Sequence, residues 1–116
     1  MTNNAQRGRA GEALAAAYLE MRGCTLVARN ERYGGVEVDL VVDEGATRVL
    51  VEVRMRSRDD YGGAAATVNP RKQHRLLRAA SAMLQLGHSR LRIDVVALDL
   101  ADDGLRLTHH RNAVAP

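Results

Sequence analysis

Residues 36–56 alternate between apolar and polar side chains on both sides of the turn segment Asp43-Glu44-Gly45-Ala46. Because successive side chains of a β-strand point to opposite faces, this alternation predicts two strands, and the short segment between them predicts a β-hairpin. The polar positions include Glu37 and Asp39 in the first strand and Glu52, Arg54 and Arg56 in the second. Three carboxylates on one hairpin could hold a divalent cation, since a carboxylate removed from water must be paired or bound to metal.

The pairing register of this hairpin depends on where its turn lies. A two-residue turn at Gly45-Ala46, with glycine first as a type II′ turn prefers, would place Asp39 opposite Glu52 and Glu37 opposite Arg54. A turn centred on Glu44-Gly45 would instead place Glu37 opposite Glu52. The sequence predicts the shared charged face and leaves the register open.

The length of 116 residues favours one domain spanning the whole chain, with loose tails at residues 1–5 and about 109–116. The longest uninterrupted apolar run, residues 13–19, is far shorter than the ~20 residues of a membrane-spanning helix. No signal-peptide pattern opens the chain, so we expect a cytoplasmic protein. Cys24 is the only cysteine, which excludes an intrachain disulfide and a cysteine-based zinc site.

The net charge of +3 conceals an uneven distribution. Between Arg54 and Arg78 the chain has seven basic and two acidic residues, so this segment carries a local charge of +5. Basic residues concentrated beside a carboxylate cluster favour a site that attracts phosphate while binding metal. The predicted partner is therefore nucleic acid.

The first predicted helix covers about residues 6–22 and ends at Gly23. Its apolar residues recur at helical spacing, which predicts that one face packs on the core. The members of this stripe are Ala10, Ala13, Leu14, Ala17, Tyr18 and Met21. Glu12 lies near the start of this helix, where a surface acid is favourable beside the positive end of the helix dipole.

The second predicted helix begins at Asn69-Pro70, an N-cap followed by proline at the first helical position, and ends at about Leu86 before Gly87. Its predicted apolar stripe is Leu76, Leu77, Ala80, Met83 and Leu84. Its first half carries Arg71, Lys72, Arg75 and Arg78. Basic residues near a helix N-terminus oppose the helix dipole unless an anion compensates them. Each of them is either a phosphate contact or part of a solvated basic face.

Three further strands are expected at residues 24–28, 91–98 and 105–108. Residues 29–35 are polar and predict a loop, and residues 57–68 predict a mobile loop that could lie over the charged face of the hairpin. The resulting order, αβββαββ, predicts an α/β domain with a mixed central sheet flanked by helices.

The chemistry that these residues permit centres on Asp39 and Glu52. Magnesium typically takes one or two protein carboxylates together with phosphate oxygens of a substrate. It would polarise a phosphodiester and activate water, while Arg54 could neutralise charge developing on the phosphate. The alternative interpretation is a cross-strand ion-pair lattice on an exposed face. No HExxH, Walker-type loop or GxSxG motif is present to support another catalytic class.

Six short motifs follow one another along the chain. They are Arg7-Gly-Arg-Ala-Gly-Glu12, Ala28-Arg-Asn30, Gly35-Val-Glu-Val-Asp-Leu40, Val49-Leu-Val-Glu-Val-Arg54 with Arg56, Lys72-Gln-His-Arg75 and Arg92-Ile-Asp-Val-Val96. Together they resemble the successive motifs of the YraN family of small bacterial proteins, which has no established function. That family is similar to the PD-(D/E)XK nucleases, which have the restriction-endonuclease-like fold, and to archaeal Holliday-junction resolvases.

The resemblance implies a Mg²⁺ or Mn²⁺ site with Asp39 and Glu52 as its acids, joined by the carbonyl of Val53 and by Glu12. It implies DNA as the partner, a role in DNA repair or recombination, and a possible homodimer. Arg56, Arg71, Lys72 and Arg75 are the expected phosphate contacts, and the roles of Glu37 and Gln73 are left open.

One residue departs from the nuclease pattern. The motif that contains Glu52 normally ends in lysine, whereas this chain has Arg54. Arginine keeps the charge and can bind phosphate bidentately, but it stays protonated and cannot act as a general base. Three hypotheses follow: a Mg²⁺-dependent structure-selective nuclease, an inactive nucleic-acid-binding or scaffold module of the same fold, and a protein-interaction domain with no nucleic-acid role.

Overall fold

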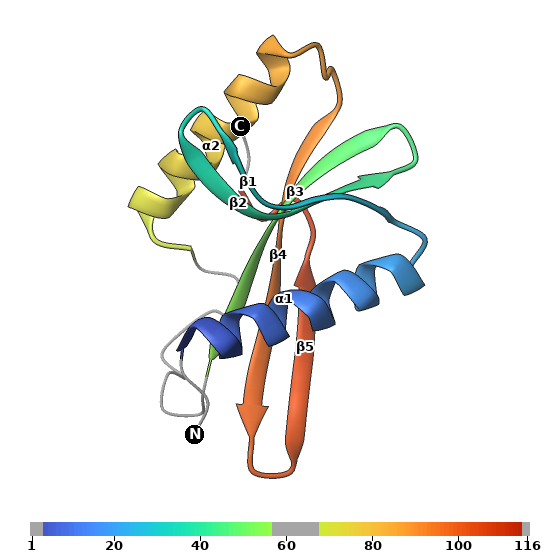
Figure 1. Cartoon of the computed structure of the whole chain (residues 1–116), viewed down its shortest axis with the longest axis vertical. Helices are drawn as coiled ribbons and strands as arrows, with labels where there is room; N and C mark the ends of the chain where they lie inside the picture. The colour runs from blue at the N-terminus through green and yellow to red at the C-terminus, as the bar shows by residue number, and fades with distance from the viewer. Residues whose placement is uncertain (1–3, 57–67, 115–116) are drawn as a thin grey trace.

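The computed structural model describes residues 4–56 and 68–114, without the side chains of residues 4–7. The elements are α1 (Asn4–Met21), β1 (Thr25–Tyr33), β2 (Val36–Glu44), β3 (Thr47–Arg56), α2 (Pro70–Gln85), β4 (Leu91–Ala101) and β5 (Gly104–His110). The five strands form one sheet in sequence order. Strands β3 and β4 are parallel, and the other neighbours are antiparallel. The two helices cover opposite faces of this sheet, each over its own apolar cluster (Figure 1). The predicted α/β class and the order αβββαββ are confirmed.

Helix α2 begins and ends where the sequence predicts. The side chain of Asn69 accepts a hydrogen bond from the backbone N–H of Lys72 at 2.9 Å, and Pro70 opens the helix. Gly87 follows the helix with φ +101°, a conformation that glycine adopts without strain. The buried residues of α2 are Leu76, Ala79, Ala80 and Met83. The predicted stripe was therefore wrong at Leu84, which is 53% exposed, and it missed Ala79.

Helix α1 turns a different face to the sheet from the predicted one. Leu14 and Met21 of the predicted stripe are 46% and 88% exposed. The buried residues are Gly11, Ala15, Ala16 and Leu19. The helix is alanine-rich on every side, so the apolar pattern has too little contrast to select a face. The described part of the chain contains no helix that is both long and apolar enough to span a membrane.

Glycine sets how closely α1 approaches the sheet. A Cβ atom at Gly11 would lie 3.2 Å from Met55 Cε and 3.3 Å from Leu98 Cδ1, on β3 and β4. The absence of a side chain therefore lets these two side chains pack directly against the helix backbone. This contact orients α1 through packing between residues far apart in the sequence, which the spacing of apolar residues within the helix does not reveal.

Strand β1 is longer than predicted, and the expected loop at residues 29–35 was wrong except for the turn at Gly34-Gly35. The strand lies at the edge of the sheet and pairs only with β2, so most of its side chains are exposed and can be polar. Its register shifts at a bulge between Leu26 and Ala28. An exposed edge strand with a bulge lacks the clean alternation from which strands are predicted.

The C-terminal segment is also more ordered than predicted. His109 and His110 belong to β5, the N–H of Ala113 donates to the carbonyl of Ile93 at 2.8 Å, and Val114 is 4% exposed. The predicted loose tail is therefore wrong for residues 109–114. At the other end, residues 4 and 5 already belong to α1. The predicted loop at residues 57–68 lies outside the described residues except for Val68, which is buried.

The turn between β1 and β2 provides a test of how α2 packs on the sheet. Gly34 and Gly35 both have positive φ, +59° and +77°. A Cβ at Gly34 would lie 3.2 Å from the Arg78 carbonyl oxygen and 3.3 Å from Ala82 Cβ, whereas a Cβ at Gly35 meets nothing within 4 Å. Both alanine variants carry the backbone cost of ~1–2 kcal/mol, and only Gly34→Ala adds overpacking of ~1–3 kcal/mol. Urea unfolding should show Gly34→Ala to be the less stable variant, and equal stability would contradict the close packing.

Candidate functional site

The two strands that carry the acids separate at the predicted site. Strands β2 and β3 pair from Glu44↔Thr47 to Leu40↔Val51. This is the register of a Gly45-Ala46 turn, and Gly45 has the positive φ, +58°, that a type II′ turn requires at its first position. Continued by one residue, the register aligns Asp39 with Glu52, as the first of the two sequence alternatives predicts.

The carboxylate of Asp39 lies at the point of separation. Its Oδ2 accepts a hydrogen bond from the backbone N–H of Val53 at 2.9 Å. A side chain thus satisfies a donor of β3 just beyond Leu40↔Val51, the last pair of the ladder with β2. This bond fixes Asp39 beside the following strand, next to Glu52.

Glu52 is a buried acid with too little compensation. Its exposure is only 3%, and Lys72 Nζ from the first turn of α2 lies 2.5 Å from its Oε2. The ammonium of Lys72 is therefore the cation that this carboxylate contacts in the described part of the chain. Burial first, and then the neighbouring charge of Asp39, raise the pKa of Glu52 to about 7, although Lys72 acts in the opposite direction. An exposed ion-pair lattice is therefore excluded for this residue.

A cavity of about 250 Å³ opens beside these acids. Residues of β2 and β3 form its acidic side, and the first two turns of α2 form its basic side. Its lining residues are Val36, Glu37, Asp39, Glu52, Lys72, Arg75 and Leu76. The structure thus brings together residues separated by up to 40 positions in the sequence (Val36 and Leu76), in a pocket that joins carboxylates to cations.

The donor atoms of this cavity fit a hard divalent cation. Carboxylate oxygens of Asp39 and Glu52 line the cavity, and the buried Oε2 of Glu52 already contacts one cation, the ammonium of Lys72. Two carboxylates are the number that Mg²⁺ commonly takes from a protein when a substrate supplies phosphate oxygens. Within residues 4–56 and 68–114, no group of three or more His, Cys, Asp or Glu side chains is arranged to hold a metal.

Glu12 approaches the site from α1 without joining the two acids. Its Oε1 accepts a hydrogen bond from Asn30 Nδ2 at 3.0 Å. Burial raises the pKa of Glu12, Asn30 lowers it, and the charges of Asp39 and Glu37 raise it further, which places its carboxylate within their electrostatic reach. Metal ligation by Glu12 and by the Val53 carbonyl stays a prediction. The exposed Glu37 lines the cavity.

The predicted phosphate contacts separate into different environments. Lys72 and the exposed Arg75 line the cavity, and Arg71 is exposed on the same helix. Arg56 instead donates from Nε to Asp99 Oδ1 at 2.7 Å, and both side chains are largely buried. The charge of Arg56 is therefore already matched by an acid of β4.

Gln73 and Arg54, two further predicted site residues, are not among the residues that line the cavity. Gln73 Nε2 donates to the carbonyl of Val68 at 2.7 Å and so holds the chain that leads into α2. Arg54 is half-buried on β3 and pairs in register with Ala97 of β4. Asp99 was missed by the sequence reasoning because the predicted strand ended at residue 98.

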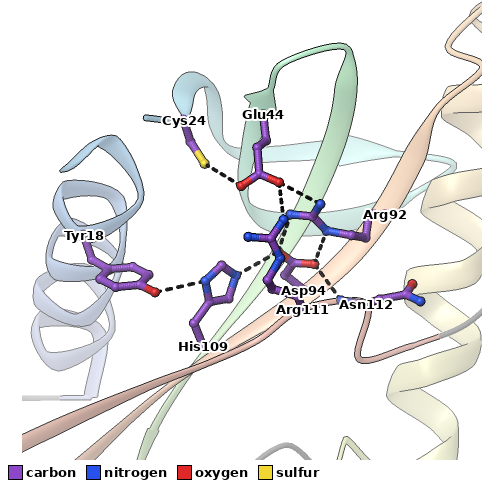
Figure 2. A network of polar contacts seen from close by, with 8 residues as sticks. All are labelled: Tyr18, Cys24, Glu44, Arg92, Asp94, His109, Arg111 and Asn112. Atoms are coloured by element: carbon purple, nitrogen blue, oxygen red, sulfur yellow. Dashed lines mark hydrogen bonds and ion pairs between the residues drawn. The ribbon is translucent and has the colours of Figure 1, made fainter. Parts of the chain in front are cut away.

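A second polar cluster lies on the α1 side of the sheet, and its centre is the fully buried Asp94 (Figure 2). Asp94 accepts hydrogen bonds from Arg92 Nε at 2.8 Å and Nη2 at 3.0 Å, from His109 Nε2 at 2.8 Å and from the Asn112 backbone N–H at 2.9 Å. His109 Nδ1 lies 3.1 Å from the hydroxyl of Tyr18 on α1. The cluster therefore ties α1 and the C-terminal segment to β4.

The cluster continues to the hairpin through Glu44 (Figure 2). Glu44 Oε1 accepts from Arg92 Nη1 at 2.9 Å and from Arg111 Nη2 at 2.5 Å, and Cys24 Sγ lies 3.9 Å from Oε2. Hydrogen bonding by Arg92 lowers the pKa of Glu44 against the opposing effect of burial. Because its carboxylates are already paired, this cluster has a structural role.

Known proteins of similar sequence identify the family of this chain. The sequence model of the uncharacterised protein family UPF0102 matches residues 11–98 of this chain. The chain belongs to this family. A UPF0102 protein of Halorhodospira halophila is 50% identical over 94 residues, covering 81% of this chain and 78% of the relative. One from Methylobacillus flagellatus is 44% identical over 102 residues, covering 86% and 90%.

The predicted resemblance to the YraN family is confirmed. The UPF0102 protein YraN of Salmonella arizonae is 49% identical over 75 residues, covering 65% of this chain and 57% of YraN. Among solved structures, SfsA of Pyrococcus furiosus in complex with Ca²⁺ is similar, with a TM-score of 0.43 and 14% identity. That similarity covers 94% of this chain and 64% of SfsA.

The Asp94 cluster predicts how stability depends on pH. Burial alone would raise the pKa of Asp94, but hydrogen bonds from His109, Arg92 and Asn112 lower it to about 2. Since the folded pKa lies below the ordinary value of 3.8, the stabilisation is complete above about pH 4 and is lost as the pH falls towards 2. We expect it to amount to about 2 kcal/mol.

Unfolding curves of Asp94→Asn measured between pH 7 and pH 2 test this expectation. The variant should be less stable at neutral pH, and its stability should decline less steeply between pH 4 and pH 2 than that of the wild type. Asp103→Asn, in the exposed turn after β4, is the matched control and should follow the wild type. An equally steep acid decline in Asp94→Asn would refute the assignment.

Proposed function

We propose that this protein binds nucleic acid and hydrolyses phosphodiester bonds with a divalent cation, Mg²⁺ or Mn²⁺, held by Asp39 and Glu52. The observation that supports this most strongly is the burial of Glu52 at 3% exposure beside a second carboxylate, where the nearby ammonium of Lys72 does not prevent the pKa of Glu52 from rising. A buried acid pair is costly in free energy unless a cation compensates it. Perturbed acids of this kind that line a cavity are typical of functional sites.

Each residue of the acidic side has a definite task in this proposal. Asp39 and Glu52 would hold the cation, with the Val53 carbonyl as a further ligand, and the N–H of Val53 orients Asp39 through its 2.9 Å bond. When bound, Mg²⁺ supplies Lewis acidity that polarises the phosphodiester and lowers the pKa of an attacking water. The cavity brings the acids and the substrate phosphate within reach of each other.

The basic side of the cavity would bind the nucleic-acid backbone. Arg75 lines the cavity and is exposed, and Arg71 extends the basic surface along α2. Both lie near the N-terminus of α2, where the helix dipole also favours a phosphate group. The resemblance to PD-(D/E)XK nucleases supports DNA as the substrate.

A second candidate function rests on Arg54. A guanidinium can bind phosphate on two oxygens, yet it stays protonated and cannot accept a proton from the attacking water. An inactive nucleic-acid-binding module of the same fold would retain the cavity and the basic helix without cleavage. The two functions therefore share a binding surface and differ only in hydrolysis.

A cleavage assay separates these functions. Purified protein incubated with branched, single-stranded and duplex DNA and with RNA, in Mg²⁺ or Mn²⁺, should cleave at least one substrate. Asp39→Asn removes the charge and keeps an oxygen that can accept from Val53, so it should lower the rate by about a hundredfold or more.

The controls of this assay decide what a signal means. Cleavage that persists undiminished in Asp39→Asn would come from a contaminant and would remove the nuclease proposal. Binding without cleavage by the wild type favours the inactive module. Activity that then appears in Arg54→Lys would identify Arg54 as the reason.

Salt dependence tests the phosphate contacts independently of cleavage. We expect binding to weaken as salt rises, with Arg75→Met reducing the slope of log K against log[salt] by about 1, because each phosphate contact contributes ~0.7–0.9. Arg22→Met, in the exposed segment after α1, is the matched control and should leave the slope unchanged. Fluorescence anisotropy on labelled DNA gives both slopes. A salt-independent affinity would show that the basic helix is not the binding surface.

A further inference from the structure

We infer that Lys72 is a built-in counter-ion that occupies the place of the divalent cation at Glu52 and must leave it when that cation binds. The inference rests on the proposed function, since it concerns the same acids. Lys72 Nζ lies 2.5 Å from Glu52 Oε2, although the Lys72 side chain is 43% exposed and that of Glu52 only 4%. The ammonium thus reaches from the protein surface into the cavity to neutralise a buried acid.

The composition of the chain makes Lys72 distinctive. Lys72 is the only lysine in the sequence, and every other basic residue that is always charged is arginine. An ammonium is a compact point charge on a flexible stem, whereas a guanidinium is a planar fork that holds its partners in a fixed geometry. The position beside the acids therefore carries the cation that most resembles a metal ion and is the easiest to displace.

The local structure allows the ammonium to leave without disturbing the fold. The backbone of Lys72 is fixed in the first turn of α2, because its N–H donates to the side chain of Asn69. Only the exposed side chain has to rotate for Nζ to leave Glu52. The pair of Arg56 and Asp99 differs, since both side chains are only 13% and 11% exposed and the arginine is held by contacts at both Nε and Nη2.

Electrostatics makes the two cations mutually exclusive. Glu52 Oε2 already contacts Lys72, and a divalent ion on the same oxygen would lie within a few ångströms of the ammonium. Repulsion between like charges at that distance is strong next to a buried carboxylate. Binding of the metal therefore releases Lys72 into the part of the cavity that Arg75 lines, where it can bind a substrate phosphate. Metal binding and nucleic-acid binding become coupled through one side chain.

Metal affinity in the absence of nucleic acid tests this inference directly. Isothermal titration with Mn²⁺ should show that Lys72→Met binds on the order of tenfold more tightly than the wild type, because the competing cation has been removed. Lys72→Arg, which keeps the charge in a group that is harder to displace, should bind Mn²⁺ no more tightly than the wild type. Arg22→Met is the matched control, since it removes an exposed cation of the segment after α1 that does not line the cavity, and its affinity should stay unchanged.

A second measurement follows Lys72 itself in the intact protein. Because the chain has a single lysine, ¹⁵N-lysine labelling yields one side-chain ammonium signal. Without metal this signal should show the slow hydrogen exchange of a paired ammonium. Addition of Mg²⁺ should change its shift and exchange rate to those of a solvated lysine.

The outcomes distinguish this inference from the proposed function. If Asp39→Asn abolishes Mn²⁺ binding while Lys72→Met binds as the wild type or more weakly, the counter-ion role is refuted and the metal site stands. If Mn²⁺ binding does not depend on Asp39, or if no variant binds Mn²⁺, both the metal site and the inference are refuted. An ammonium signal that Mg²⁺ leaves unchanged likewise refutes the displacement.

Discussion

The carboxylate of Glu52 is buried beside Asp39, and this constraint organises the surrounding structure. A buried acid needs either a cation or hydrogen-bond donors. The strands β2 and β3 separate at this point, so the Val53 N–H is available to Asp39, and the first turn of α2 brings Lys72 to Glu52. The cavity, the position of α2 and the proposed chemistry all depend on how this negative charge is compensated.

A second buried acid in the same sheet, Asp94, is fully compensated by hydrogen bonds. Asp94 is as inaccessible as Glu52, yet four hydrogen bonds from three residues surround it, and its pKa falls to about 2. The pKa of Glu52 rises to about 7 under burial and the charge of Asp39. Two carboxylates in one fold thus have opposite pKa shifts because the donors around Asp94 outweigh its burial, whereas Lys72 does not outweigh the burial of Glu52 and the charge of Asp39. The matched acid stabilises the fold, and the unmatched acid is the one suited to bind a ligand.

The two helices have different roles with respect to the two buried acids. Helix α1 approaches the sheet closely through Gly11, Ala15 and Ala16, and its Tyr18 joins the Asp94 cluster. Helix α2 packs through larger side chains and directs basic residues from its first two turns towards the acids. The α1 face of the sheet therefore carries the Asp94 cluster, and the α2 face carries the cavity.

Local sequence patterns determined much of this architecture. Alternation between Val36 and Arg56 identified the hairpin and its acids, Asn69-Pro70 identified the start of α2, and the motifs identified the family, because each depends on neighbours in the chain. The face of α1, the order of the C-terminal segment and the contact of Lys72 with Glu52 were decided only by tertiary structure. Those features arise from contacts between residues far apart in sequence, and an alanine-rich helix or a polar tail carries no periodic signal of its partner. The sequence thus identified Asp39 and Glu52 as the acids of the site, and the tertiary structure determined that Lys72 is the cation in contact with Glu52.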